Sequence, residues 1–508
     1  MLAKVKSFGL SGLIGLPIDV EVDVSNGQPH FDIVGLPDAS VKESKERVRS
    51  AISNSGFKFT NGKITVNLAP AFARKEGPAF DLSIAVAYLS ALGQIDFDKT
   101  KNFVFIGELG LDGSLRPVKG LLPIIISARE LGFKKFIIPF DNSKEASYVG
   151  EITCYALKDL SEVAAFLSGK ELISSVKYQE WKYNSENKFS EDLSRVKGQF
   201  AAKRALEIAV SGGHNILMVG PPGSGKTMLA KCVPSILPEL TKEEALEITK
   251  IHSVAGTLDL NKGIVNSRPF RSPHHTASTV ALTGGGRDAK PGEISLAHNG
   301  VLFLDELPEY QRNTLESLRQ PLEDGFITVA RAASTVEYQA NFILVASMNP
   351  CPCGNYGSKD LECTCTPSMI SKYMKKISGP LLDRIDLKID VDRVSFYDIK
   401  DESKEESSAE VRARVNEARK VQLERFAGEK IYCNAKMTSK HIKKYCVLDE
   451  AGEALLANAF ERFHLSMRGY NRILKVARTI ADLDKCENIQ VEHVAEAISF
   501  RNVDKLSM

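Results

Sequence analysis

The order of hydrophobic and polar residues changes its period along the chain, and each period predicts a kind of element. Ile18, Val20, Val22 and Val24 alternate with other residues, which is typical of a half-buried strand. Apolar runs predict further strands, and apolar residues three and four positions apart predict two helices. These strands are expected at 63–68, 103–106 and 135–139, and the helices at 41–52 and 82–92. The pattern predicts a mixed α/β domain.

Further along the chain, short runs are apolar at every position. Ile216–Val219 and Val301–Leu304 are such runs, and Phe342–Ser347 is apolar up to its final serine. Strands that are buried on both faces of a parallel sheet have this composition. The last part of the sequence instead has helical spacing, with helices expected at 409–426, 449–463, 468–484 and 491–499.

Two polar stretches rich in Ser, Lys and Glu interrupt these patterns at 174–195 and 400–410, as linkers or exposed connections do. The sequence therefore predicts an α/β protein with several parts. They are an α/β domain at 1–173, a linker at 174–195, a parallel-sheet α/β domain at 196–399 and a helical domain at 400–508.

Composition narrows the class of protein. Hydrophobic residues make up 43% and charged residues 26% of 508 positions, as in ordinary soluble globular proteins. The net charge of +2 means that nucleic-acid binding would need local basic surfaces. We expect no membrane span and no signal peptide, because the apolar runs are too short. Nine cysteines with two CxC pairs favour a reducing compartment, so the expected location is cytoplasmic.

The apolar run at 216–219 leads directly into GPPGSGKT, which matches the phosphate-binding loop GxxxxGK[ST]. Glycines let the backbone N–H groups of such a loop surround phosphate oxygens, and its lysine neutralises phosphate charge. The final hydroxyl is a ligand of Mg²⁺. The predicted nucleotide-binding residues are Gly220, Pro221, Pro222, Gly223, Ser224, Gly225, Lys226 and Thr227.

The apolar strand at 301–304 ends in Asp305 and Glu306. Together the two motifs predict an NTPase in which Asp305 binds Mg²⁺ with Thr227 and Glu306 activates the attacking water. Asn349 follows the strand at 342–347, where an amide suits the orientation of that water. The alternative is a plain strand-end turn, because Asn-Pro favours turns.

Two arginines are candidates for contact with the γ-phosphate. Arg384 lies in GPLLDRIDL, and an arginine donated across a subunit boundary stabilises the charge that develops on that phosphate. The alternative is a surface pair with Asp383 or Asp386. Arg468 opens a predicted helix, where an ordinary cation is unfavourable beside the helix dipole, so a functional role is favoured.

Four cysteines form the pattern CxC-x9-CxC, and they are Cys351, Cys353, Cys363 and Cys365. Four thiolates on one loop fit a tetrahedral, structural Zn²⁺ site. The alternative is a reduced loop without metal, because CxC is tighter than the usual CxxC spacing.

Longer motifs carry a resemblance to a known family. They are RPFRSPHHT (268–276), GGGRDAKPGEISLAHNGVLFLDE (284–306), MNPCPCG (348–354), SGPLLDRIDL (378–387) and SMRGYNRILKVARTIADL (466–483). By these motifs the whole chain resembles the ComM/YifB family of bacterial magnesium-chelatase-like AAA+ ATPases. The resemblance implies a homo-hexameric ring with ATP and Mg²⁺ at the subunit interfaces.

The resemblance also implies roles for single residues. Lys226, Thr227, Asp305, Glu306 and Asn349 would act within one subunit. Arg384 would come from the next subunit, and Arg468 matches the sensor arginine of the C-terminal lid, which acts in trans in the related helicase branch. Residues 196–199 match the segment at the adenine side.

In such rings two loops line the channel. Their expected positions are a tip at 284–287 and a hairpin at 322–339. Arg287, Lys290 and Arg331 are then candidates for sequence-independent contacts with DNA phosphates, with solvated loop cations as the alternative. His274 and His275 adjoin Arg271, and adjacent histidines rarely ligate one metal, so a structural or DNA-facing role is favoured.

The motifs at 77–85 (GPAFDLSIA) and 107–139 resemble the proteolytic domain of Lon-type proteases. In that family the first motif carries a serine after Gly-Pro, and a helix in the second carries a lysine. Here Ala79 and Leu122 occupy those positions, while Ser83 and Lys119 are out of register. Because a hydroxyl nucleophile needs an adjacent base, the domain is expected to be an inactive scaffold or docking surface.

These observations predict an ATP-dependent DNA motor, and the resemblance implies branch migration of recombination intermediates during natural transformation. Two alternatives stay open. One is the ATPase subunit of a magnesium chelatase, which would need partner subunits, and the other is a protein-remodelling ATPase. Stimulation of the ATPase activity by branched DNA would distinguish the motor from both.

Overall fold

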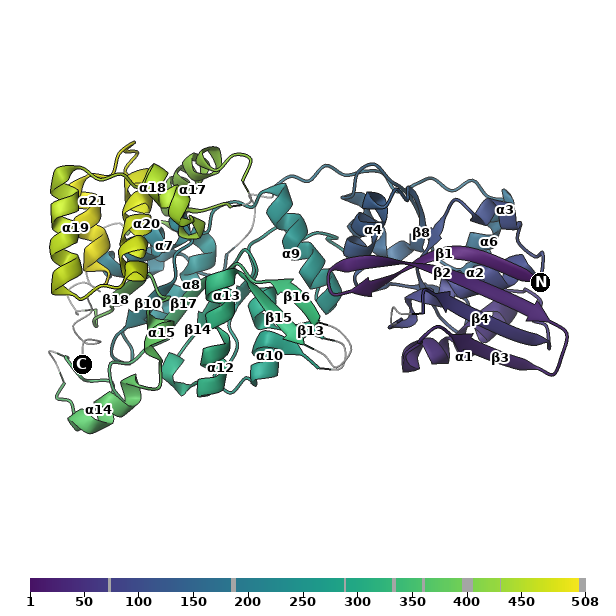
Figure 1. The fold of residues 1–508 in the computed structure, drawn as a ribbon, viewed down its shortest axis with the longest axis horizontal. Coiled ribbons are helices and arrows are strands. Elements are labelled where there is room, and N and C mark those ends of the chain that lie inside the picture. Colours follow the sequence, from purple (N-terminus) through teal and green to yellow (C-terminus); the bar gives the residue numbers. More distant parts are fainter. Residues whose placement is uncertain are drawn as a thin grey trace. The chain divides into compact units, whose positions relative to one another are not determined.

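The chain folds into two compact units, which are shown as a ribbon in Figure 1. The computed structural model describes residues 1–71, 75–183, 189–286, 289–330, 335–358, 361–394, 405–429 and 431–501. Unit 1 comprises Met1–Lys182 and Thr241–Asn266, and unit 2 comprises Tyr183–Leu240 and Ser267–Met508. The segment 241–266 therefore leaves unit 2, joins unit 1 and returns.

Unit 1 is built on a seven-stranded sheet with the order β3-β4-β2-β1-β5-β8-β9. The strands are β1 (Leu2–Ser11), β2 (Ile14–Ser25), β3 (His30–Val34), β4 (Lys63–Ala69), β5 (Val104–Phe105), β8 (Lys135–Pro139) and β9 (Thr153–Leu157). β2 runs antiparallel to β1 and β4, whereas β1, β5, β8 and β9 are parallel. The predicted alternation in β2 is confirmed, because Ile18, Val20, Val22 and Val24 are all buried.

Helices cover both faces of this sheet. They are α1 (Ala39–Asn54), α2 (Asp81–Ala91), α3 (Phe97–Thr100), α4 (Leu121–Glu130), α5 (Ser143–Ser147), α6 (Leu160–Ser168) and α9 (Lys242–Ala255), with a small hairpin of β6 (Glu108–Leu109) and β7 (Leu115–Arg116). Successive residues of β8 enter different cores: Ile137 packs with α1, α2 and α6, while Phe136 and Ile138 pack with α4. This alternation places one hydrophobic core on each face of the sheet.

Helix α9 is the part of the segment 241–266 that packs against α4. Its Leu246 joins the core on the α4 face. The Ser253 hydroxyl donates to the buried carboxylate of Glu145, and the Gly120 N–H donates to the Ser253 carbonyl over 3.2 Å. Further bonds run from Lys144 Nζ to the Asn261 carbonyl (2.7 Å) and from Trp181 Nε1 to Asn266 Oδ1 (3.1 Å). The segment is thus an integral part of unit 1.

Unit 2 contains a five-stranded sheet with the order β11-β14-β17-β10-β18. The strands are β10 (Ile216–Val219), β11 (Phe270–Arg271), β14 (Val301–Leu304), β17 (Ile343–Met348) and β18 (Leu387–Asp390). Every pairing in the sheet is parallel. All residues of β10, β14 and β17 are buried, which confirms the buried strands expected from the sequence.

Helices and hairpins surround the sheet of unit 2. They are α7 (Phe200–Gly212), α8 (Lys226–Ile236), α10 (Thr279–Thr283), α11 (Glu293–Leu296), α12 (Arg312–Ser317), α13 (Arg319–Asp324), α14 (Pro367–Met374), α15 (Gly379–Leu382), β12 (Gly284–Gly285) with β13 (Lys290–Pro291), and β15 (Phe326–Ala330) with β16 (Thr335–Gln339). The hairpin expected at 322–339 is present from 326 onward, whereas 322–324 belong to α13. The loop candidates Arg287 and Arg331 lie outside the described residues, whereas Lys290 is exposed in β13.

The C-terminal helices gather beside α7 and α8 (Figure 1). They are α17 (Ser408–Arg425), α18 (Ser439–Tyr445), α19 (Glu450–Arg462), α20 (Met467–Leu483) and α21 (Val491–Ser499). Four of them were expected, within one residue at each end, and α18 was not. The fold class is thus confirmed: two α/β parts, the second with a parallel sheet, and a helical C-terminal region.

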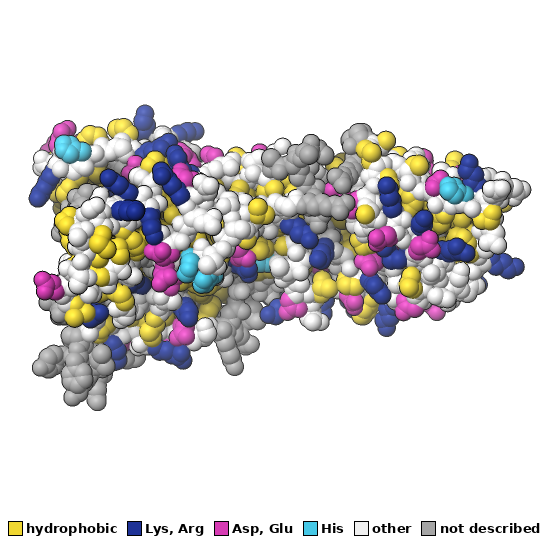
Figure 2. Space-filling model, turned by 90° about the horizontal axis from the view of Figure 1, so that it is seen from below, with side chains coloured by type: hydrophobic (Ala, Val, Ile, Leu, Met, Phe, Trp, Pro, Cys, Tyr) yellow, Lys and Arg dark blue, Asp and Glu magenta, His cyan; other side chains and the backbone are white. Residues whose placement is uncertain are grey.

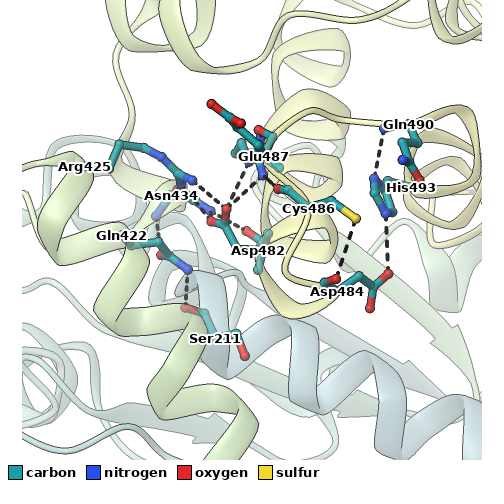
Figure 3. A network of polar contacts seen from close by, with 12 residues as sticks. Ser211, Gln422, Arg425, Asn434, Asp482, Asp484, Cys486, Glu487, Gln490 and His493 are labelled. Carbon is teal, nitrogen blue, oxygen red and sulfur yellow. Dashed lines mark hydrogen bonds and ion pairs between the residues drawn. The ribbon is translucent and has the colours of Figure 1, made fainter.

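A buried polar network connects α17 and α20 to each other and to α7 (Figure 3). Asp482, whose side chain is 1% exposed, accepts bonds from Arg425 (2.6 and 2.8 Å), Asn434 (2.8 Å) and Arg478 (3.1 Å). Gln422 Nε2 donates to the Ser211 carbonyl over 3.1 Å, at the end of α7. Since α7 leads into β10, the helical region is connected to the strand that carries the phosphate-binding loop.

Basic and acidic side chains are interspersed on the face drawn in Figure 2, in agreement with the small net charge of +2. Among the described residues, no helix has both the length and the apolar character needed to cross a membrane.

Candidate nucleotide-binding site

The loop after β10 has the backbone of a phosphate-binding loop. Gly220 packs closely against Val391, the residue after β18, because a Cβ on Gly220 would lie only 2.1 Å from the Val391 carbonyl oxygen. Gly225 has φ = 89°, a conformation that favours glycine, and it directly precedes α8. The glycines thus allow the tight turn that leads directly into the N-terminus of α8, and a helix N-terminus of this kind binds phosphate.

Lys226 lies at the centre of this loop. Its Nζ donates to the carbonyls of Gly220 (2.7 Å) and Pro221 (2.8 Å) and lies 3.3 Å from Asn349 Oδ1. Burial lowers the pKa of Lys226 to about 8, although Asp305 and Glu306 act in the opposite direction. Lys226 begins α8 and Asn349 follows β17, and the structure brings the two side chains together.

Thr227 and Asp305 supply two oxygen atoms suited to Mg²⁺. The Thr227 hydroxyl donates to Asp305 Oδ2 over 2.8 Å. The other carboxylate oxygen accepts from the Ser347 hydroxyl and from the Glu306 N–H at 3.1 Å. A hydroxyl and a carboxylate are hard donors of the kind that Mg²⁺ prefers beside nucleotide phosphates, so the residues fit this ion. When bound, the ion would neutralise phosphate charge.

Glu306 follows directly, in the left-handed conformation (φ = 51°). Its carboxylate lies 3.5 Å from His275 Nδ1, and the His274 and His275 rings lie 4.1 Å apart. Among the described residues, neither histidine belongs to a metal-ligand group. His275 thus contacts the predicted water-activating carboxylate, whereas His274 Nδ1 lies 2.8 Å from the Thr276 hydroxyl. The role of the two histidines remains a prediction.

The segment expected at the adenine side also reaches the loop. Gln199 Nε2 donates to the Ser224 carbonyl (3.3 Å) and to the Asp392 carbonyl (2.5 Å). The nearby Gly198 N–H donates to Glu405 over 2.8 Å. Residues 196–199 thus connect the loop to the segment after β18.

Arg384 and Arg468 lie together, but away from the phosphate-binding loop. Arg384 is fixed at the beginning of β18, where its carbonyl accepts from Asn215 Nδ2 over 3.0 Å, just before β10. The loop follows the other end of β10. Because β10 and β18 are parallel and four residues long, about 13 Å of strand separates the two ends. Arg384 pairs with Glu323, and so does Arg468.

Arg384 does not form the alternative surface ion pair with Asp383 or Asp386. Arg384 is buried, and it pairs with Glu323 of α13. Asp386 instead pairs with Arg472 over 2.5 Å. Burial alone would raise the pKa of Asp386, but Arg472 and His214 hold that pKa below its usual range.

The four predicted zinc ligands form one cluster. The sulfur atoms of Cys351, Cys353, Cys363 and Cys365 all lie within 4.8 Å of one another. A hydrogen bond from the Asn355 backbone lowers the pKa of Cys353 to about 5. Four sulfur donors at these distances fit a tetrahedral Zn²⁺ site.

In unit 1, the residues at the two Lon positions have no catalytic chemistry. Leu122 is buried in the core on the α4 face, and its N–H donates to Glu145 over 3.0 Å. Ser83, which is out of register, is buried and donates to the Phe80 carbonyl over 2.7 Å. Leu122 and Ser83 are therefore both part of the packed interior of unit 1.

Sequence reasoning missed Ser347 and Glu323 altogether, and it named His275 without its contact to Glu306. Ser347 contacts Asp305, His275 contacts Glu306, and Glu323 joins the two arginines. The only available signal was positional for Ser347, which ends a buried strand next to the one carrying Asp305. Glu323 stands outside every motif.

Comparisons with known proteins agree with this geometry. Residues 192–399 match the family model "Magnesium chelatase, subunit ChlI", residues 20–142 match "Subunit ChlI of Mg-chelatase", and residues 405–501 match the "subunit ChlI C-terminal" model. The chain is 44% identical to competence protein ComM of Haemophilus influenzae over 508 residues, covering 99% of this chain and 98% of that protein.

Two further relatives complete the comparison. YifB of Escherichia coli is 43% identical over 506 residues, covering 99% of this chain and 98% of YifB. Lon protease 2 of Bacillus subtilis is 27% identical over 163 residues, covering 29% of each chain. Full-length identity of this size, together with the matching nucleotide site, shows that the chain belongs to the ComM/YifB family of magnesium-chelatase-like AAA+ proteins, a membership that implies an ATPase.

Proposed function

We propose that this protein is an ATP-driven DNA motor that works as a homo-hexameric ring in the cytoplasm. It would promote branch migration of recombination intermediates during uptake of transforming DNA. ATP binds at the phosphate-binding loop with Mg²⁺ on Thr227 and Asp305, and Glu306 activates the attacking water.

One observation carries the ring. The groups that hold ATP follow the ends of β10, β14 and β17, whereas Arg384 lies in the turn just before β18. Parallel strands place these groups at opposite edges of the sheet. An arginine there is too far from its own loop to contact a phosphate bound to it, so it is available to an ATP held by a neighbouring copy. Head-to-tail contacts of this kind close into rings.

Arg468 supports the same arrangement, because it shares the carboxylate of Glu323 with Arg384. Both arginines would therefore reach the same γ-phosphate from the adjoining subunit. Guanidinium groups stabilise the charge that develops there during hydrolysis.

The DNA substrate is supported by the relative named as a competence protein and by two hairpins. β12 with β13 and β15 with β16 form two-stranded sheets separate from the five-stranded sheet of unit 2, and Lys290 is exposed on the first. Exposed cations on loops make sequence-independent phosphate contacts. The cysteine cluster would hold Zn²⁺ in a structural role, because four protein ligands leave no open position.

The function is tested by ATP-dependent branch migration of a synthetic four-way junction. Lys226→Ala and Glu306→Gln should both abolish strand movement, while Glu306→Gln still binds ATP. Lys231→Ala changes an exposed lysine on the same helix, α8, and should behave as the unchanged protein.

Two results would contradict the proposal. Branch migration by Lys226→Ala at the normal rate would exclude ATP hydrolysis at this loop as its energy source. An ATPase activity that is the same with and without branched DNA would favour a chelatase subunit or a protein-remodelling ATPase instead.

A further inference from the structure

Glu323, the second-last residue of α13, connects the two arginines that the proposed function assigns to the neighbouring subunit's ATP. One carboxylate oxygen pairs with Arg384, and the other accepts from Arg468 NH2 over 2.8 Å. The three residues come from α13, the turn before β18 and the start of α20. No other carboxylate among the described residues is paired with both arginines.

The surroundings make this carboxylate necessary. Arg319, Arg384, Arg468 and Arg472 lie close enough that the other three act on the pKa of Arg384, which burial and then these cations lower. Two of the four have separate partners: Arg319 pairs with Glu316 (3.0 Å) and Arg472 with Asp386 (2.5 Å). Glu323 remains to compensate Arg384 and Arg468. Without it, two like charges would repel each other in a partly buried place.

The contact also fixes the orientation of the Arg384 guanidinium. Its NH1 donates to the Pro380 carbonyl over 2.8 Å, and its NH2 faces Glu323. Its Nε is buried and has no partner among the described residues. A planar guanidinium held at two of its nitrogens has one orientation in its plane.

Arg468 differs in burial. Its side chain is 63% exposed, whereas that of Arg384 is 8% exposed. An exposed arginine side chain has many rotamers, and ordering it costs entropy at the moment of binding. The shared carboxylate holds the exposed Arg468 beside the buried Arg384. The two guanidinium groups are therefore already arranged as a pair before a phosphate binds.

We infer that Glu323 is a positioning residue for ATP hydrolysis in the adjoining subunit. It holds Arg384 and Arg468 as a pair facing the γ-phosphate of the neighbour's ATP. This inference rests on the proposed function, because it needs both arginines to act across the subunit boundary. Glu323 itself contacts neither the nucleotide nor the reacting water.

The first test separates positioning from binding. Glu323→Gln keeps the shape but removes the charge, and it should lower kcat about 10- to 100-fold, as misplacement of a catalytic group does. KM for ATP should change less than about twofold, because the arginines contribute in the transition state. Glu323→Asp, which keeps the charge, should recover part of kcat. Asp324→Asn removes the adjacent exposed carboxylate and should leave kcat unchanged.

The second test asks in which subunit Glu323 acts. Glu306→Gln subunits cannot hydrolyse ATP but carry intact arginines, and Glu323→Gln subunits have the reverse defect. In a one-to-one mixture, about a quarter of the interfaces combine a competent site with an intact arginine pair. Mixed rings should therefore exceed the summed activities of the two separate variants. Arg384→Ala mixed with Glu306→Gln is the reference for such recovery.

The outcomes are distinguishable. No recovery in the Arg384→Ala mixture would remove the trans arginine and this inference with it. Recovery there without recovery in the Glu323→Gln mixture would overturn the role of Glu323 alone. Higher ATPase activity of Glu323→Gln than of the unchanged protein would also overturn it, because the carboxylate would then restrain the arginines.

Discussion

The Thr227 hydroxyl donates a 2.8 Å hydrogen bond to Asp305, so that the phosphate-binding loop and the acidic end of β14 present two oxygen atoms to one point. The distance between these atoms is set by the parallel pairing of β10, β17 and β14, which places both strand ends at the same edge. The geometry is therefore built into the sheet.

Removing one of these oxygens should weaken the use of Mg²⁺. We expect Thr227→Val to raise the Mg²⁺ concentration for half-maximal ATPase activity by at least about tenfold, because one hard ligand is lost. Thr227→Ser retains the hydroxyl and should stay close to the unchanged protein. A Mg²⁺ titration of ATPase activity measures both, and an unaltered requirement in Thr227→Val would exclude Thr227 as a ligand.

The cysteine cluster should contain about one Zn²⁺ per subunit when the protein is purified without chelators. Cys353→Ser should lose most of this zinc, as measured by elemental analysis. Cys486→Ser changes a cysteine outside the cluster and should retain it. Protein that is fully folded and active but free of zinc would show that the loop needs no metal.

Asp482 should be the most sensitive residue of the helical region. Replacement by Asn leaves Arg425 and Arg478 buried without their countercharge, and breaking a buried pair in this way costs about 3–5 kcal/mol. Urea unfolding of the variant gives the change in unfolding free energy. Asp484→Asn alters an exposed pair two positions away and should cost less than about 1 kcal/mol.

Glu145 should make the stability of unit 1 depend on pH. Burial raises the pKa of Glu145 above 4.5 in the folded protein, despite bonds from Ser253, Asn142 and Leu122. A group whose pKa is raised by folding contributes its full stability below the unfolded pKa and loses it as pH rises through the folded pKa. The unfolding free energy of the unchanged protein should therefore decline over that interval.

Glu145→Gln has no proton to release, so it should lack this decline while keeping an oxygen that accepts from Leu122. The quantity to compare is the difference in unfolding temperature between the two proteins at several pH values, because other groups titrate in both. A constant difference from pH 4.5 upward would mean that Glu145 has an ordinary pKa.

Sequence patterns were sufficient where structure is decided locally. The buried strand Ile216–Val219 and the loop directly after it were predicted at their observed places. The same holds for α17, α19, α20 and α21, whose apolar spacing is continuous. The assignments of Glu306, Asn349, Arg384 and Arg468 to catalytic steps remain predictions.

Relationships between distant elements were not predictable. Glu323 gains its importance from two arginines that come from other elements, and no spacing in the sequence connects them. Helix α9 has the composition of an ordinary amphipathic helix, and only packing shows that Leu246 belongs to the core beside α4. Helix α18 is short, so its two turns gave too few apolar positions to reveal a period.

The path of residues 241–266 determines how this protein can be divided into fragments. The backbone passes between the units three times, at 182/183, 240/241 and 266/267, so cutting one connection does not separate them. Arg268 donates to the carbonyls of Pro238 (2.7 Å) and Glu239 (3.0 Å). These bonds join the chain just after the segment 241–266 to the chain just before it. A truncated ATPase fragment that begins after residue 182 would retain α9 without unit 1, so the apolar face of α9 would be exposed to solvent. Exchange of the front half between relatives would succeed only if this helix were exchanged with it.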